Sequence, residues 1–268
     1  MINLGAKNVL GVEVSAVDYE YAVDRIIASA KAGTRCTTSA LAVHGVMTGA
    51  MDRIHRHRLN RLDLVTPDGQ PVRWALNLLH RTGLRDRVSG PNLMPLVCAA
   101  ATREGLGVYL YGSTDAVLKN LRANLQRMVP GITISGSQPS RFRRLDAAEI
   151  PPLVESIRAS GAKILFVGLG CPRQEVFAYE MGAHLQMPIL AVGAAFDYHA
   201  GFLKDTPLIL QRMGLQWLHR LLQDPRRLWR RYLVTNTQFL FLFFAQWLRL
   251  WSPDPASTCE PGEDIRYG

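Results

Sequence analysis

The sequence predicts an α/β protein: a Rossmann-like, mostly parallel sheet with helices on both faces, followed by a helical, arginine-rich appendage that associates with a membrane. Short runs rich in Val, Ile and Leu recur along most of the chain, and stretches with helical spacing separate them. Continuous apolar runs that alternate with helices are typical of parallel sheets covered on both faces. After residue 208 this alternation ends, and arginine and aromatic residues gather.

Each apolar run bounded by turn residues is expected to be a strand, and each amphipathic stretch a helix. The expected strands are residues 9–16, 35–43, 107–112, 133–140, 163–170 and 188–197. The expected helices are residues 17–32, 115–128 and 147–160. In a sheet of this kind we expect ligands at the carboxyl ends of the strands.

Composition divides the chain into three segments. Residues 1–207 carry the strand and helix pattern and form the Rossmann-like domain. Residues 208–251 form the basic and aromatic appendage, and residues 252–268 have the Pro, Ser and Gly content of a disordered tail.

The charge balance and the cysteines limit the class of protein. Lys and Arg number 31 against 22 Asp and Glu, and the resulting net charge of +9 suits an anionic partner: nucleic acid, a phospholipid surface or a phosphate-rich substrate. The 4 cysteines form no CxxC pair, which suits a reducing cytosol and predicts neither a zinc site nor a disulfide framework. The first residues lack the apolar run of a signal peptide. We therefore expect a cytoplasmic protein.

The appendage combines positive charge with an apolar stretch. Its arginines include Arg220, Arg227, Arg230 and Arg231, and residues 233–251 are rich in Phe, Leu and Trp. Polar residues such as Asn236 interrupt this stretch, so a helix lying in the membrane interface suits it better than a spanning helix. The alternative is an ordinary core helix packed on the sheet domain.

Three expected strands end in glycine turns. These turns begin at Gly112, at Gly168 and at residue 193, and they should converge at one edge of a parallel sheet. After Gly168 and Gly170 a helix is expected near Pro172, and a helix N-terminus attracts phosphate. We therefore predict a nucleotide site that includes Gly112, Gly168, Gly170, Gln174, Glu175 and Asp197. The dinucleotide fingerprint is missing, because Gln174 and Glu175 stand where its later glycine would be.

A second candidate region is the turn Thr66-Pro67-Asp68-Gly69. Taken alone, such a turn is adequately explained by an Asx hydrogen bond. Further on, Arg87 beside a Gly-Pro loop suits a phosphate or carboxylate contact.

Metal-binding motifs are missing from the sequence. His55 and His57 are surrounded by arginines, so we expect a solvated basic face there rather than a metal site. The chain also has no DxD motif. We therefore expect chemistry that uses neither a metal nor a cofactor.

Taken in order, several motifs resemble the WecB/TagA/CpsF family of bacterial glycosyltransferases. They are TPDGQP, RVSGPNL, VYLYGS, ILFVGLGCPRQE, AVGAAFD and RMGLQWLHRLLQDPRRLWRRYL, spread over about residues 43–233. The resemblance implies inverting, metal-independent transfer of N-acetylmannosamine, its uronic acid or a related sugar. The donor would be a UDP-sugar and the acceptor an undecaprenyl-diphosphate-linked sugar, at the inner face of the membrane.

The resemblance also assigns roles to residues. It implies that Asp68 is the general base and that Gln174 and Asp197 bind the donor. We also predict that Thr66 and Gly69, in the same turn as Asp68, bind the donor or its phosphates. The appendage arginines Arg220, Arg227, Arg230 and Arg231 would meet the lipid diphosphate. The chain departs from the family pattern in two places. Ala40 and Ala42 stand where many members have Thr and Asn, and Gln216 stands where Glu is frequent.

Three other classes of protein fit parts of the sequence. A nucleic-acid-binding protein would explain the arginines, but not the neighbouring apolar stretch. A nicotinamide-dependent enzyme would need the missing fingerprint. A non-catalytic nucleotide-binding membrane adaptor would have no need of the TPDG turn at residues 66–69 or of the PRQE turn at residues 172–175. The oligomeric state is open, a homo-oligomer included.

Overall fold

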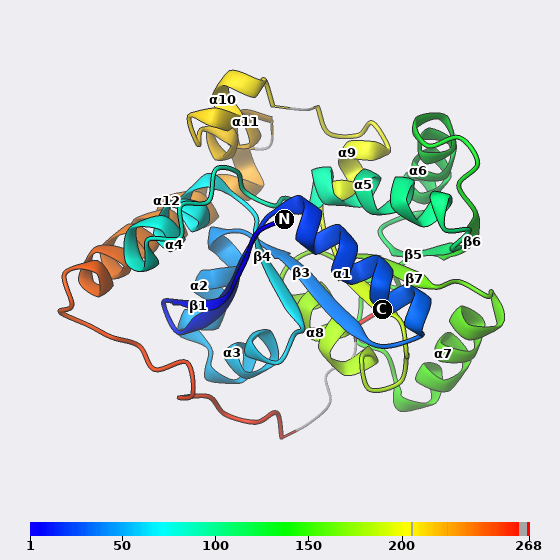
Figure 1. Cartoon of the computed structure of the whole chain (residues 1–268), viewed down its shortest axis with the longest axis horizontal. Helices are drawn as coiled ribbons and strands as arrows, with labels where there is room; N and C mark the ends of the chain where they lie inside the picture. Colours follow the sequence, from blue (N-terminus) through cyan, green and yellow to red (C-terminus); the bar gives the residue numbers. More distant parts are fainter. Residues whose placement is uncertain (205, 224, 263–266) are drawn as a thin grey trace.

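The computed structural model describes residues 1–204, 206–223, 225–262 and 267–268 (Figure 1). In the helices of the appendage, the side chains of Leu208, Arg212, Arg227, Arg230 and Arg231 also lie outside the described part. Three of the four arginines predicted to meet the acceptor are therefore placed by their backbone only.

The centre of the molecule is a six-stranded sheet in which every neighbouring pair is parallel. Its order is β4 (Leu64–Pro67), β3 (Cys36–Leu41), β8 (Pro188–Ala191), β7 (Ile164–Gly168), β5 (Val108–Gly112) and β6 (Ile134–Gln138). The predicted α/β class and parallel sheet are confirmed.

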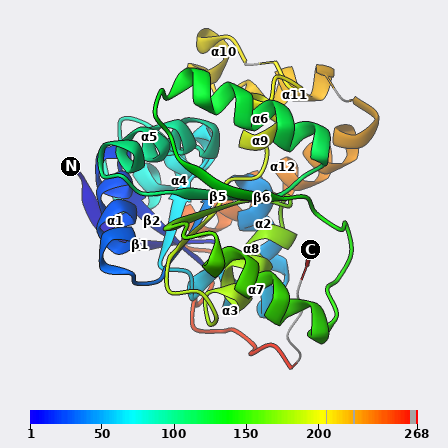
Figure 2. The ribbon, with the colours of Figure 1, turned by 90° about the vertical axis from the view of Figure 1, so that its right-hand side faces the viewer.

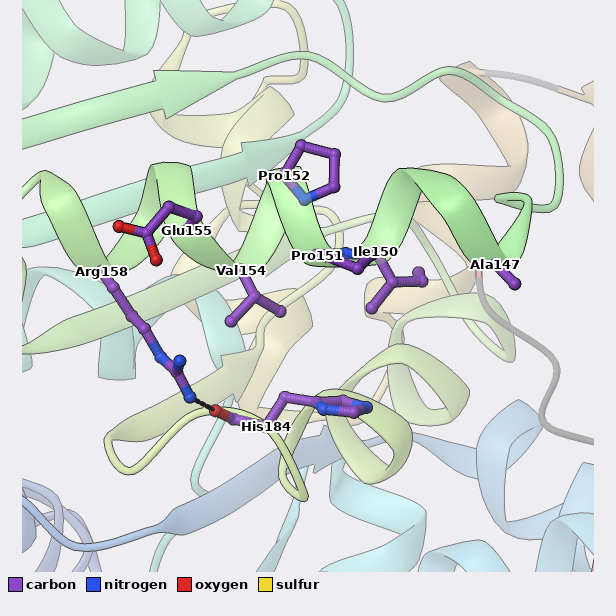
Figure 3. Close-up of a pocket in the computed structure, with 8 residues that line it drawn as sticks. All are labelled: Ala147, Ile150, Pro151, Pro152, Val154, Glu155, Arg158 and His184. Carbon is purple, nitrogen blue, oxygen red and sulfur yellow. Dashed lines mark hydrogen bonds between the residues drawn. The ribbon is translucent and has the colours of Figure 1, made fainter.

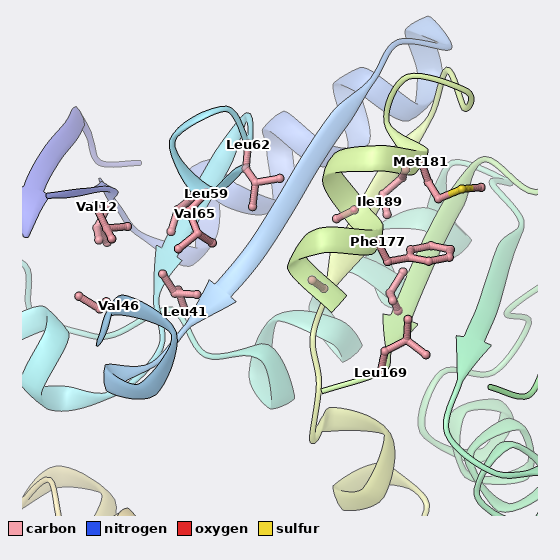
Figure 4. Close-up of a cluster of buried hydrophobic side chains, with 14 of the residues drawn as sticks. Val12, Leu41, Val46, Leu59, Leu62, Val65, Leu169, Phe177, Met181 and Ile189 are labelled. Atoms are coloured by element: carbon pink, nitrogen blue, oxygen red, sulfur yellow. The ribbon is translucent and has the colours of Figure 1, made fainter. Parts of the chain in front are cut away.

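Helices cover both faces of the sheet, because alternate strand residues point to opposite sides. Tyr109 and Tyr111 of β5 pack into one buried cluster, whereas Val108 and Leu110 pack into the other. The first cluster contains α2 (Val43–Met51), α3 (Arg53–Asn60), α4 (Gln70–His80), α7 (Ile150–Ala159) and α8 (Arg173–Met181), and Figure 4 shows part of it. The second contains α1 (Tyr19–Ala32), α5 (Gly90–Arg103), α6 (Asp115–Met128) and α9 (Ala195–His199). Figure 2 shows α6 and α7 on opposite sides of β5 and β6.

The first expected strand is instead a hairpin outside the main sheet. β1 (Asn3–Val9) and β2 (Val12–Val17) pair antiparallel across a two-residue turn. Both turn residues have positive φ, 55° at Leu10 and 88° at Gly11. Turns of this kind reverse the chain with the twist that strands prefer, so the apolar run folds back on itself.

The appendage consists of α10 (Leu208–Arg212), α11 (Gln216–Gln223) and the long α12 (Pro225–Trp247). α12 lies beside α4 (Figure 1) and buries Phe239 and Phe243 in the first cluster. Its other side exposes Leu240, Phe241 and Phe244. One side of the apolar stretch is therefore packed as a core helix, and the other side is exposed. None of the helices in the described ranges is long and apolar enough to cross a membrane.

The expectation of a solvated face around His55 and His57 is wrong. All four residues from His55 to Arg58 are buried. Arg56 donates hydrogen bonds to the carbonyls of Gly49 (3.0 Å) and Ala50 (2.6 Å), and Arg58 pairs with the buried Glu180 at 3.2 Å. Burial also lowers the pKa of His55 to about 4. Charged side chains tolerate burial when carbonyls and carboxylates satisfy them, which a one-dimensional charge pattern does not reveal.

The segment after α12 runs along α3. Asn8 donates to the Pro253 carbonyl at 2.7 Å, and Asn60 donates to the Pro255 carbonyl at 3.1 Å. The backbone N–H of Cys259 donates to the Arg53 carbonyl at 3.2 Å. These contacts join the end of the chain to the hairpin and to α3.

Candidate active site

The predicted glycine turns meet at the carboxyl edge of the sheet. Gly112 of β5 lies opposite Gly168 of β7, and a Cβ on Gly112 would stand 2.8 Å from the Gly168 backbone. The next strand, β8, ends at the Gly193 turn, whose N–H donates to the Val167 carbonyl at 3.4 Å. The close approach of these strand ends requires glycine at position 112, since any side chain there would meet backbone atoms.

Asp68 lies at the same edge, directly after β4. Its backbone N–H donates to the Leu41 carbonyl at 3.1 Å, which fixes the turn against the end of β3. The hydroxyl of Thr66 donates to the Val88 carbonyl at 3.0 Å, and the Val88 N–H donates to the Pro67 carbonyl at 3.0 Å. Gly69 then takes a φ of +119°, a left-handed conformation that leads the chain into α4. Thr66 and Gly69 therefore shape the turn that presents Asp68.

The Asp68 side chain is partly buried, with 23% of it exposed. Burial raises its pKa, while Arg87, a hydrogen bond from the Gly90 backbone and the charge of Arg220 act in the opposite direction. The net direction is upward. Asp68 is thus a carboxylate whose affinity for a proton is higher than that of an ordinary aspartate.

Arg87 joins the Asp68 turn to the appendage. It is buried, and its Nη1 lies 3.9 Å from Oδ1 of Asp68. The same nitrogen donates to the side-chain carbonyl of Gln216 in α11, and Nη2 donates to that of Gln211 in α10 at 2.9 Å. Arg220 of α11 lies over the Tyr198 ring, 5.9 Å from its centroid. The first two appendage helices therefore lie against the Asp68 edge.

Glu175 and Gln174 begin α8, at the end of β7, and both are buried. Oε1 of Glu175 accepts hydrogen bonds from Ser39 (3.0 Å) and from the Gln174 amide (2.8 Å). Among the described residues, Oε2 of Glu175 and Oε1 of Gln174 have no hydrogen-bond partner. Burial raises the pKa of Glu175. The site thus contains two buried oxygen acceptors whose hydrogen-bonding capacity is incomplete.

The remaining predicted residues occupy the same region or cannot be placed fully. Asp197 lies in α9, after the Gly193 turn, and its backbone carbonyl accepts from the N–H groups of Phe202 and Leu203. Gly170 follows β7 with a φ of +75°. The side chains of Arg227, Arg230 and Arg231 lie outside the described part of the chain.

Sequence reasoning missed two contributors to this edge. Ser39 lies in β3, and its contact with Glu175 depends on the packing of α8 against β3. Gln211 contacts Arg87 only because α10 lies over the edge. The available signal was polarity, since Ser39 follows two threonines in β3 and Gln211 follows an apolar run in α10. Ala40 packs close to the start of α5. A Cβ added to Gly90 would lie 3.4 Å from the Cβ of Ala40.

Two surface cavities lie away from these residues. One, of about 540 Å³, follows α7 and reaches His184 (Figure 3). The other, of about 340 Å³, lies at the amino end of β3 beside α8 and includes Arg35 and Arg61. Neither contains a predicted site residue. Within the described ranges, no three His, Cys, Asp or Glu side chains gather in a way that could hold a metal ion.

Comparison with known proteins identifies the family. A family model described as the glycosyl transferase WecG/TagA/CpsF family matches residues 7–253 of the 268. The match extends from the hairpin through the sheet and all three appendage helices, so it includes the Asp68 turn, the α8 N-terminus and the Arg87 contacts. The chain belongs to the WecG/TagA/CpsF family of glycosyl transferases.

Proposed function

We propose that the protein transfers a sugar from a UDP-sugar to an undecaprenyl-diphosphate-linked acceptor at the inner face of the membrane, in the synthesis of a cell-surface polysaccharide. The observation that carries this proposal is the contact of Asp68 with Arg87 at the edge where the glycine turns meet. A carboxylate beside a guanidinium, next to backbone suited to phosphate, supplies both a base and an anion-binding group.

Asp68 acts as the general base in a single displacement. It accepts the proton of an acceptor hydroxyl while that oxygen attacks the anomeric carbon from the face opposite UDP. The new carbon–oxygen bond forms as the bond to the diphosphate breaks, and the electron pair leaves with UDP. The configuration at the anomeric carbon is therefore inverted. The raised pKa of Asp68 makes it a stronger base than an ordinary aspartate.

Arg87 and the turn at 168–175 stabilise the negative charge that develops on the departing diphosphate. Arg87 is already buried in place, so little reorganisation is needed when the charge appears. The helix N-terminus of α8 offers backbone N–H groups to the phosphates. The incomplete acceptors on Gln174 and Glu175 suit hydroxyl or amide donors of the bound sugar nucleotide. Gly112, Gly170 and Asp197 complete the donor site.

The appendage binds the acceptor at the membrane surface. The lipid diphosphate is bound by Arg220, whose charge lowers the pKa of Asp68, and by the α12 arginines Arg227, Arg230 and Arg231. The exposed apolar side of α12 enters the headgroup region, as interfacial helices do. Attachment of the enzyme and capture of its lipid substrate then use neighbouring parts of one appendage.

Calorimetry tests the donor site directly. We expect the purified full chain to bind UDP saturably, to bind it equally in the presence of EDTA, and to give no heat with NAD. The same preparation should move label from one member of a UDP-sugar panel onto a polyprenyl-diphosphate-linked sugar. Binding of NAD without UDP would refute the assignment, and binding of UDP without transfer to any acceptor would favour an adaptor.

A further inference from the structure

The Arg87 guanidinium is held by neutral groups. Its two terminal nitrogens donate to the side-chain carbonyls of Gln216 and Gln211, whereas the Asp68 carboxylate lies farther away at 3.9 Å. Arg87 has 8% of its surface exposed, so water screens its charge little. A carboxylate at either glutamine position would form a charge-assisted hydrogen bond and offset the positive charge. The glutamine amides hold the guanidinium without offsetting its positive charge.

We propose that Gln211 and Gln216 are positioning residues for the transfer reaction, which fix Arg87 beside Asp68 through uncharged carbonyls and so leave its positive charge free to act on Asp68 and on the diphosphate. The inference rests on the proposed function only for the roles of Asp68 and Arg87. The charge that acts on Asp68 then depends on how α10 and α11 dock against Arg87.

The orientation of the Gln211 amide supports this role. Its Nε2 donates to the Thr206 carbonyl at 2.7 Å, which turns Oε1 toward Arg87. The Thr206 hydroxyl in turn contacts Nδ1 of His219 in α11 at 3.1 Å. An amide with its nitrogen already bonded presents its oxygen in one direction only. The connection therefore ties α10 and α11 to each other and to Arg87.

The positions of Gln216 and Arg220 on α11 also support this role. Gln216 and Arg220 are four residues apart, so they lie on one face of the helix. Gln216 contacts Arg87, and the charge of Arg220 lowers the pKa of Asp68 together with that of Arg87. Among the described residues, these two arginines and the Gly90 backbone are the groups that stabilise the charged form of Asp68. One face of α11 thus sets much of the electrostatic environment of the base.

The test replaces each amide by the carboxylate of the same shape. In Gln216→Glu and Gln211→Glu the new charge offsets that of Arg87, so the Asp68 pKa should rise by at least about 0.5 unit, with the acid limb of the pH–rate profile moving equally. Gln126→Glu is the control, because Gln126 is exposed on α6 and is not part of the connection through Gln211, Thr206 and His219. It should leave the pKa of Asp68 unchanged.

Two readouts separate this inference from the proposed function. Carbon-13 NMR of the Asp68 carboxyl group reports its pKa in the full chain without any substrate, and the pH–rate profile reports it during transfer. A raised pKa in both position variants, and not in the control, supports the inference even if no sugar is transferred. Equal pKa values in wild type, Gln216→Glu and Gln211→Glu, with folding verified by circular dichroism, would overturn it.

Discussion

Two carboxyl groups at the edge of the sheet have raised pKa values for the same main reason, burial, but they have different neighbours. Asp68 is influenced by Arg87 and Arg220, which favour its charged form. Glu175 instead accepts hydrogen bonds from Ser39 and Gln174, both uncharged. A group that must lose and regain a proton benefits from nearby cations that keep it partly ionised. Glu175 suits a role in which it stays in place and accepts hydrogen bonds.

The pH dependence of stability distinguishes Glu175 from an ordinary glutamate. Because folding raises its pKa above 4.5, the folded protein binds this proton more tightly than the unfolded chain does. Its contribution to the free energy of unfolding therefore falls as pH rises from about 4.5 through the folded pKa. Glu175→Gln should remove this fall and give equal or higher stability at pH 8, measured by urea unfolding over a pH series.

Glu155→Gln is the control for that experiment, since Glu155 is exposed on α7. It should keep the wild-type pH dependence. Glu175→Ala should instead lose about 1–3 kcal/mol at low pH, because Ser39 and Gln174 would lose their acceptor. This loss relative to wild type should shrink as pH rises, because alanine also lacks the titrating carboxyl group. The same pH dependence in wild type and Glu175→Gln would show that Glu175 is not the buried acid described above.

At the scale of elements, α12 is fixed to the body by a polar residue within its apolar stretch. Oε1 of Gln246 accepts from the Leu10 N–H at 3.0 Å, and its Nε2 donates to the Asn8 carbonyl at 3.2 Å. Backbone groups of the hairpin turn are thus hydrogen-bonded to a helix that lies far along the chain. The sequence shows Gln246 as an interruption of the apolar stretch, and the structure gives the reason for it.

Gln246→Ala should weaken the docking of α12. The loss of two hydrogen bonds to a partly buried turn should cost about 1–2 kcal/mol and increase hydrogen exchange in α12 and in the hairpin. Gln238→Ala on the exposed side of the same helix is the control and should change neither. Equal exchange in the two variants would contradict the anchoring role of Gln246.

Elements differ in how far their sequence determines them. β5 and β7 are continuous apolar runs that end in glycine, and both follow from the sequence pattern. β4 has four residues between helices, too few for a clear pattern, so its place at the sheet edge depends on its pairing with β3. The buried arginines of α3 depend on carbonyls of α2 and on the segment after α12. Contacts between distant segments cannot be found from local spacing.

At the scale of the whole molecule, one appendage both contacts the Asp68 edge of the sheet and carries the exposed apolar surface. α10 and α11 lie together at one end of the molecule (Figure 1), where Gln211 and Gln216 contact Arg87. α12 continues from them and exposes Phe241 and Phe244, 74% and 50% accessible. Exposed aromatic side chains on a helix that also carries arginines are typical of attachment to anionic membranes.

Binding to vesicles tests this arrangement. The double variant Phe241→Glu with Phe244→Glu should lose most binding to anionic phospholipid vesicles in a sedimentation assay, because it places charge on the inserting side. Its circular dichroism should match that of wild type, since both side chains are exposed. Phe142→Glu, an equally exposed change on the loop after β6, is the control and should bind as wild type does. Unchanged binding of the double variant would refute membrane attachment through α12.

Within the candidate site, the positions of the glycine turns and of the Asp68 turn could be predicted from the sequence, but the contacts that join them to the appendage could not. Convergence of Gly112 and Gly168 follows from parallel strands, and Asp68 is marked by its turn. The bond of Arg87 to two glutamines depends on how the appendage folds back over the sheet. The resemblance to the family supplied the functional role that residue spacing alone left open.

The most direct test of the account compares Asp68→Asn with wild type in two assays on the same preparation. Transfer from the UDP-sugar to the polyprenyl-diphosphate-linked acceptor should fall by a factor of about 10² or more, because the amide cannot accept the proton. UDP affinity by calorimetry should stay within a few-fold of wild type, since the carboxyl group is retained in shape. Transfer by Asp68→Asn at the wild-type rate would contradict the central claim that Asp68 is the base.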